Sequence, residues 1–143
     1  MLEVMVALFV LGIGLMGVLS MQAKSNKYNQ STYYYAQAAY LANDIADAMR
    51  TNRSVSSSYT IMLDDPTPTA QDCTSTSVNC TAAQIKDWNI NAWRTNVVNN
   101  LPSGKASIES DGNFFTIKVQ FNDARSSSDG AEDLHEYVLV TEV

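Results

Sequence analysis

The hydrophobic positions divide this chain into an apolar start, an amphipathic stretch and a mixed remainder. Twenty residues from Val4 to Ala23 carry no charge. At about 1.5 Å per residue a helix of this length spans roughly 30 Å, the thickness of a bilayer core. Apolar residues then recur at helical spacing, at Tyr34, Ala38, Leu41, Ala42, Ile45 and Met49. Because residues 1–52 contain no proline, we predict one long helix, apolar over 1–23 and amphipathic over 24–52.

The stretch 53–101 predicts a loop region followed by a second helix. Residues 53–80 are rich in Ser, Thr, Asp and Pro, which indicates loops, with a short strand expected at 59–63. "TAAQ" at 81–84 matches a capping box, so a helix is predicted over 81–101, ended by "LPSG". Its apolar face is expected from Ile85, Trp88, Ala92 and Val97, with Trp93 beside it.

The last part of the chain, 105–143, predicts an antiparallel sheet. "SDGN" at 110–113 is typical of a hairpin turn and follows a short strand over 106–109. Period-two alternation continues on both sides of the next loop, at Phe115, Ile117, Val119, Phe121, Tyr137, Leu139 and Thr141. We therefore expect an α+β fold, with the sheet packed on the amphipathic half of the long helix and residues 53–143 forming a globular head.

Composition and charge narrow the function classes. The formal net charge is −6, and an acidic surface does not attract phosphate backbones, so no nucleic-acid partner is expected. One histidine, His135, leaves little room for histidine-based catalysis. The sequence carries no nucleophile–base pair, phosphate loop or cofactor motif, so neither enzyme activity nor a cofactor is predicted.

Two cysteines, Cys73 and Cys80, lie seven positions apart. Two sulfur atoms without a nearby histidine fall short of a zinc site, so a structural disulfide that closes a short loop is favoured over a metal site. The carboxylates of Asp123, Asp129, Glu132 and Asp133 fit no EF-hand spacing and are interpreted as a solvated loop. No metal site is predicted.

The charges around the apolar stretch predict that the head lies on one side of a membrane, whereas the cysteine pair predicts the other side. Lys24 and Lys27 follow the stretch and no basic residue precedes it, which by the positive-inside rule places the head in the cytoplasm. A disulfide indicates an oxidising compartment instead. A short basic leader ahead of Met1, missing here, would remove the conflict, and we expect one. A cleaved signal peptide is disfavoured because no A-x-A site follows the stretch.

The motifs taken together resemble the type IV pilins and pseudopilins. "LEVMVALFVLGIGLMGVLSMQ" at 2–22 is similar to their N-terminal helix. "AQAAYLANDIADAMRTNR" at 36–53, the cysteine loop, the Trp-bearing helix and "LPSG" resemble the minor pilins called pilus modification protein PilV. The resemblance implies a pilin-like fold and a precursor whose basic leader is removed by a prepilin peptidase, which also methylates the new N-terminus.

The resemblance also implies an assembly role. Glu3 matches the family glutamate, whose carboxylate would pair with the N-terminal ammonium of a neighbouring subunit in the fibre core. The implied partners are other minor pilins, the major pilin and an inner-membrane assembly platform, with membrane lipid around the helix before assembly. The implied location is the inner membrane with the head in the periplasm, and then the pilus at the cell surface, where minor pilins prime, modify or cap the fibre in twitching motility and adhesion.

Aromatic residues supply candidate contacts between subunits. Tyr34 is expected to pack beneath the sheet, whereas Tyr28, Tyr33, Tyr35 and Trp93 are candidates for subunit contacts. Two other functions stay open. One is a pseudopilin of a type II secretion system, which uses the same helix. The other is a membrane-anchored periplasmic binding or adhesion domain that never polymerises.

Overall fold

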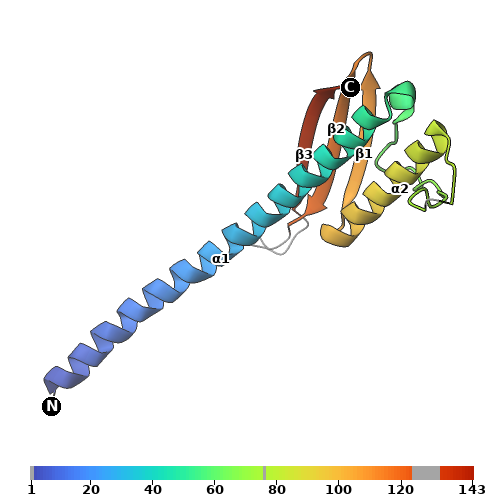
Figure 1. Ribbon diagram of the computed structural model, residues 1–143. Coiled ribbons are helices and arrows are strands. Elements are labelled where there is room, and N and C mark those ends of the chain that lie inside the picture. Colours follow the sequence, from blue (N-terminus) through green and yellow to red (C-terminus); the bar gives the residue numbers. More distant parts are fainter. Residues whose placement is uncertain (1, 76, 124–132) are drawn as a thin grey trace.

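The chain folds as a long helix that carries an α+β head (Figure 1). The computed structural model describes residues 2–75, 77–123 and 133–143. In chain order the elements are α1 (Leu2–Thr51), the 3₁₀ helix η1 (Arg53–Ser58), α2 (Ala82–Asn100), β1 (Lys105–Asp111), β2 (Phe114–Asn122) and β3 (Leu134–Glu142). The predicted fold class is confirmed, and the predicted bounds of both long helices hold to within one residue at each end.

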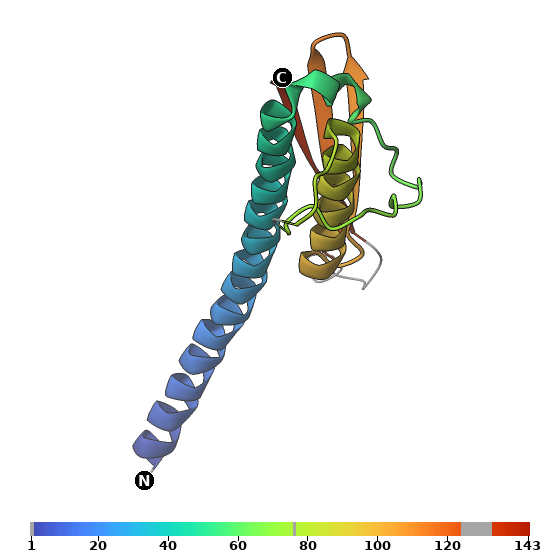
Figure 2. The ribbon, with the colours of Figure 1, turned by 45° about the vertical axis from the view of Figure 1, so that its right-hand side comes forward.

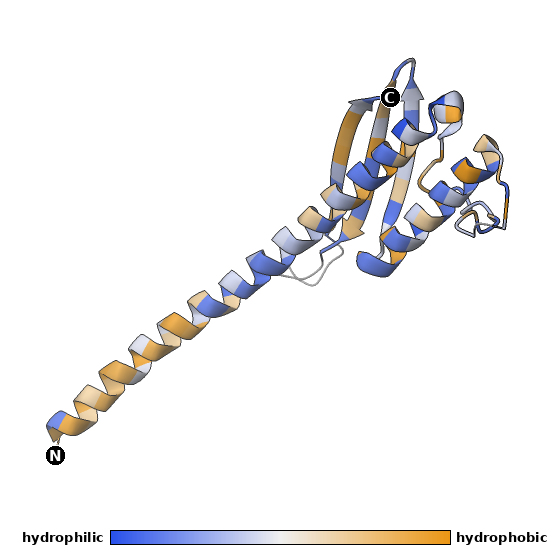
Figure 3. Cartoon of the chain, viewed as in Figure 1, coloured by the Kyte–Doolittle hydropathy of each residue, from blue (hydrophilic) through white to orange (hydrophobic). Residues whose placement is uncertain are grey.

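Helix α1 is unbroken over 50 residues, about 75 Å at the standard rise. Its first half projects away from the head and its second half packs on the sheet (Figures 1 and 2). The projecting half is almost uniformly apolar, whereas polar and apolar residues alternate in the packed half (Figure 3). The apolar stretch ends at Ala23, whereas the first fully buried residue of the helix is Ala38, so a more polar, largely exposed part of α1 separates the apolar stretch from the core of the head.

The buried stripe of α1 is the predicted one. Its fully buried members are Ala38, Leu41, Ala42, Ile45, Ala46 and Met49. Tyr34 is half-buried and packs against the same core, as expected. Alanines make up half of this stripe, and their small side chains let the helix backbone approach the head closely.

The sheet is antiparallel, as predicted, and its strand order is β1-β2-β3. Asp111 pairs with Phe114, so Gly112 and Asn113 form a two-residue hairpin loop. Gly112 has a φ of 63°, which explains the glycine in "SDGN". The alternating residues of β2, Phe115, Ile117, Val119 and Phe121, are all buried. Strand β1 is longer than the four residues predicted for it.

Both long helices lie side by side on the inner face of the sheet (Figure 2). Helix α1 packs against β2 and β3, and α2 packs against β1 and against α1. Within the described residues no helix covers the outer face, where Phe114, Val138 and Val140 are exposed. The core of the head is therefore one layer, enclosed between the helices and the sheet.

The strand predicted at 59–63 is present only as a single bridge, between Ile61 and Ile108. Past this bridge the carbonyls of Met62 and Leu63 accept hydrogen bonds from the guanidinium of Arg94, at 2.8 and 2.7 Å. The prediction of a full strand is wrong because a side chain, and not a neighbouring strand, satisfies these backbone groups.

Helix α2 begins and ends as the sequence indicates. Thr81 Oγ1 accepts from the Gln84 amide at 3.3 Å, and Gln84 Oε1 accepts from the Thr81 amide at 2.9 Å, which completes the capping box. In "LPSG" the backbone at Gly104 packs so closely on Val97 that a Cβ would clash with the Val97 carbonyl. Glycine at this position lets the chain turn directly from α2 into β1.

The buried face of α2 differs from the prediction. It consists of Ile90, Trp93, Arg94 and Val97, whereas Ile85, Trp88 and Ala92 are only half-buried. The spacing of apolar residues does not reveal this face, because one of its positions is occupied by an arginine. The prediction of Trp93 as a subunit contact is therefore wrong: its side chain is 2% exposed and belongs to the core of the head.

Candidate functional site

The projecting half-helix, residues 2–23 of α1, is an uncovered apolar surface. None of its most hydrophobic window is buried within the described chain, and it is long and apolar enough to cross one membrane. Side chains such as Phe9, at 71% exposure, would each lose roughly 1.5–3 kcal/mol of burial energy if left in water. This surface therefore requires lipid or other protein around it.

Charged residues bound the projecting half-helix at its two ends. Glu3 lies in the first turn of α1 and is exposed, and Lys24 and Lys27 follow the apolar stretch. A carboxylate is favoured in a first turn because the unpaired backbone N–H groups there carry partial positive charge. The carboxylate of Glu3 is exposed in the described structure and can therefore meet a cation from another molecule.

The predicted tyrosine contacts fall into two groups. The side chains of Tyr28 and Tyr33 are 73% and 55% exposed. The hydroxyl of Tyr35 instead lies 2.8 Å from Nδ1 of His135, and its ring stands edge-on to that of Phe121. Tyr35 therefore joins α1 to the sheet of its own chain, and Tyr28 and Tyr33 are the ones available to a neighbour.

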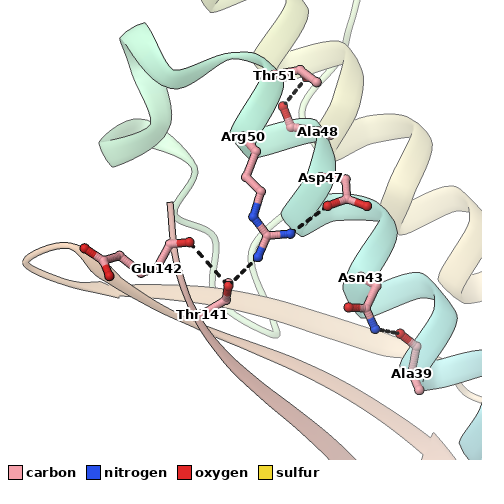
Figure 4. A network of polar contacts seen from close by, with 8 residues as sticks. All are labelled: Ala39, Asn43, Asp47, Ala48, Arg50, Thr51, Thr141 and Glu142. Carbon is pink, nitrogen blue, oxygen red and sulfur yellow. Dashed lines mark hydrogen bonds and ion pairs between the residues drawn. The ribbon is translucent and has the colours of Figure 1, made fainter.

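A second polar contact joins α1 to β3 near the other end of the head. Arg50 Nη1 lies 2.6 Å from Oδ1 of Asp47, and its Nη2 donates to Oγ1 of Thr141 at 2.6 Å (Figure 4). With the Tyr35–His135 contact, α1 is held to the same strand at two points. The head is therefore fixed in its orientation relative to the packed half of α1.

Buried Arg94 is an anchor that the sequence analysis missed. Its guanidinium donates to the carbonyls of Asp65, Met62 and Leu63 in the loop and of Ala106 in β1. Burial lowers the pKa of Arg94, an effect opposed by the nearby carboxylates. The one available signal was spacing, because Arg94 lies four residues after Ile90 and three before Val97 on the buried face.

Some of the other ionisable groups of the head form surface pairs. Lys105 Nζ lies 2.7 Å from Asp64 Oδ1, and this hydrogen bond and charge lower the pKa of Asp64. Within the described residues no group of three or more His, Cys, Asp or Glu side chains could hold a metal ion. Asp129 and Glu132, weighed above as calcium ligands, lie outside the described residues.

Cys73 and Cys80 form the predicted disulfide, with their Cα atoms 5.9 Å apart. It closes an exposed loop between η1 and α2. A disulfide persists in an oxidising compartment, so the head is suited to one.

Replacing both cysteines (Cys73→Ser with Cys80→Ser) is expected to lower the free energy of unfolding by about 2 kcal/mol, because a short loop regains its conformational freedom in the unfolded chain. Urea unfolding of the detergent-solubilised chain measures this loss, with Ser77→Ala in the same loop as the control. Limited proteolysis should cut the serine variant within 73–80. Equal stability and equal resistance to protease would contradict a structural role for the bond.

Comparisons with models of known protein families, with curated proteins and with solved structures found no match. The site is thus defined by its own geometry. Within the described residues it consists of an uncovered apolar half-helix that carries the exposed Glu3, the exposed Tyr28 and Tyr33 further along the same helix, and a head fixed to that helix.

Proposed function

We propose that this chain is a minor pilin subunit of a bacterial type IV pilus, and that it helps to prime, modify or cap the fibre. One observation carries the proposal. The projecting half-helix is not covered by any of the described residues, and it continues, without a break, into the helix that holds the head. Such a helix can be inserted in lipid or bundled with other helices, and the head stays outside in both cases.

The two environments of the half-helix explain how a subunit moves from membrane to fibre. Its apolar side chains contact lipid tails in a bilayer and other apolar helices in a bundle, so the transfer exposes little apolar surface to water. The partners in the bundle are other minor pilins and the major pilin. Before that step the subunit waits in the inner membrane with its head in the periplasm, beside an assembly platform, after a prepilin peptidase has processed its precursor.

Glu3 supplies the specificity of docking. A charge placed inside hydrocarbon costs about 2.5 kcal/mol or more at the bilayer centre, and less near its edge. In a dry helix bundle an unpaired carboxylate is strongly unfavourable, and pairing with the N-terminal ammonium of a neighbour removes that cost. Only one axial register of the two helices brings these charges together, so the pair favours correct stacking.

The test compares fibres sheared from cells that produce the wild-type chain, Glu3→Ala or Asp44→Ala. Asp44 is an exposed carboxylate on the packed half of the same helix and serves as the matched control. We expect the wild type and Asp44→Ala in the sheared fraction. Glu3→Ala should insert normally in the membrane but enter fibres at least tenfold less, which corresponds to about 1.4 kcal/mol of lost docking energy.

Other outcomes would overturn parts of the proposal. Normal incorporation of Glu3→Ala would remove the docking role of Glu3. Absence of the wild type from sheared fibres, together with exoproteins trapped in the periplasm of a deletion strain, would favour a type II secretion pseudopilin. Absence from fibres with no secretion defect and no loss of twitching would favour a membrane-anchored domain that does not polymerise.

A further inference from the structure

Within the described residues, strand β3 lies at one edge of the sheet and pairs only with β2 (Figure 1). The hydrogen bonds around Ile108 show which backbone groups of β3 point outward. Ile108 exchanges both of its backbone hydrogen bonds with Ile61, at 3.0 and 2.8 Å, on the side away from β2. Ile108 and Ile117 therefore face each other as a pair that is not hydrogen-bonded.

Antiparallel pairs alternate along a strand between hydrogen-bonded and non-hydrogen-bonded. Since Ile117 does not bond to β1, its N–H and C=O point toward β3, where its partner is Leu139. The backbone N–H and C=O groups of the residues on either side of Leu139 therefore point away from β2. The backbone groups of Glu136, Val138 and Val140 lie on the free edge, and no hydrogen bond joins them to another element of the described chain.

The free edge lacks the features that usually protect edge strands. Natural edges are shortened, bulged, interrupted by proline or guarded by an outward lysine. Strand β3 has nine paired residues in continuous register with β2, without a bulge, a proline or a lysine. On its outer face Val138 and Val140 are 48% and 60% exposed. This edge can therefore receive another strand.

The charges beside these valines define what the added strand would carry. Glu136 and Glu142 are exposed and flank Val138 and Val140 on the outer face. Lys118, on the neighbouring strand, is paired with Glu109 at 2.8 Å, and this hydrogen bond, the Glu109 charge and, less strongly, the Glu136 charge raise the pKa of Lys118. The outer face of the edge therefore has a glutamate at each end of an apolar centre, and the nearby Lys118, which is shared with Glu109, leaves its net charge negative. A second copy of β3 would bring more glutamates, which disfavours self-pairing.

We propose that the free edge of β3 binds, by strand addition, an extended segment of a partner protein with alternate apolar residues between two basic ones. Main-chain hydrogen bonds to residues 136–142 give affinity, and the flanking Lys or Arg side chains pair with Glu136 and Glu142. The inference is independent of the proposed function, since the edge would bind such a segment whether or not the chain enters a fibre.

The test measures binding of a labelled peptide, Lys-Thr-Val-Thr-Val-Thr-Lys, to the full chain in detergent by fluorescence anisotropy. Its lysines match the spacing of Glu136 and Glu142, and a peptide with Glu in place of both lysines is the control. Val138→Pro removes an outward N–H that makes no bond within the sheet, so the head should keep its circular dichroism while affinity for the basic peptide falls at least tenfold.

The double variant Glu136→Lys with Glu142→Lys leaves the backbone unchanged and tests charge separately. This variant should lose affinity for the basic peptide and gain affinity for the acidic peptide. Saturable binding with this pattern supports strand addition. The proposal is overturned if the wild type binds neither peptide, if it binds both equally, or if a folded Val138→Pro variant binds as well as the wild type.

Discussion

Trp93→Ala is expected to lower the free energy of unfolding of the head by about 4 kcal/mol, within the range seen when a large buried aromatic side chain is removed. Trp93 is 2% exposed, and it lies where α2 packs against α1. Its Nε1 donates to the carbonyl of Leu41 at 2.9 Å, directly across that interface. The substitution therefore leaves a cavity between the two helices and removes the one hydrogen bond recorded between their buried faces in the described chain.

Urea unfolding of the full chain in detergent micelles, followed by near-ultraviolet circular dichroism, checks this expectation. Trp88→Ala is the matched control, because Trp88 is on the same helix but half-buried, and it should cost clearly less. Trp93→Phe keeps most of the apolar volume, so its loss in free energy of unfolding should lie between those of Trp93→Ala and Trp88→Ala. If Trp88→Ala is the more destabilising change, the packing of α2 described here is wrong.

Arg94→Met is expected to cost about 3 kcal/mol, because hydrogen bonds from a charged donor contribute roughly 1.5–3 kcal/mol each and these are not additive. Methionine keeps the apolar contacts of the aliphatic part of the arginine side chain, so the lost free energy of unfolding measures the contribution of the guanidinium. Four carbonyls from two segments lose a donor, and that of Ala106 lies in the sheet and cannot readily be solvated. The loop around Met62 should separate from β1, together with the bridge between Ile61 and Ile108.

Denaturant unfolding gives the size of this effect, and hydrogen exchange at the Ile61 and Ile108 amides locates it. Arg53→Met removes an exposed arginine and should change the stability little. Arg94→Lys keeps the charge but not the planar fork that reaches several carbonyls at once, so it should recover only part of the loss. Unchanged exchange at Ile61 and Ile108 in Arg94→Met would show that the loop is held by other contacts.

Trp93 and Arg94 also matter for the proposed function, because these adjacent residues of α2 join the helix to different parts of the head. Trp93 ties α2 to α1, and Arg94 ties α2 to the loop and to β1. In the proposed function the chain enters a fibre through α1, and this requires a head that stays folded on that helix. Loss of fibre incorporation in either variant, with Glu3 intact, is therefore interpreted as a defect of the head and not of docking.

The periodic parts of this chain were predictable from the sequence. Long runs of apolar residues at helical or alternating spacing, as in α1 and β2, leave only one way to bury the apolar face. The capping box at Thr81 and the glycine at position 112 act within a few residues, so their effect is local and readable. The cysteine pair was equally local, since only seven positions separate the two residues.

Contacts between distant residues were decided by the tertiary structure alone. Trp88 was expected on the buried face of α2 and Trp93 beside it, but Trp93 is the buried one, because only the positions of α1 and the sheet decide between two residues of one helix. Arg94 was counted as polar, yet it is buried because four carbonyls from 12 to 32 positions away converge on it. The free edge of β3 likewise depends on which strand lies in the middle of the sheet. Local patterns fix local structure, whereas burial of a polar group requires partners that only the fold brings together.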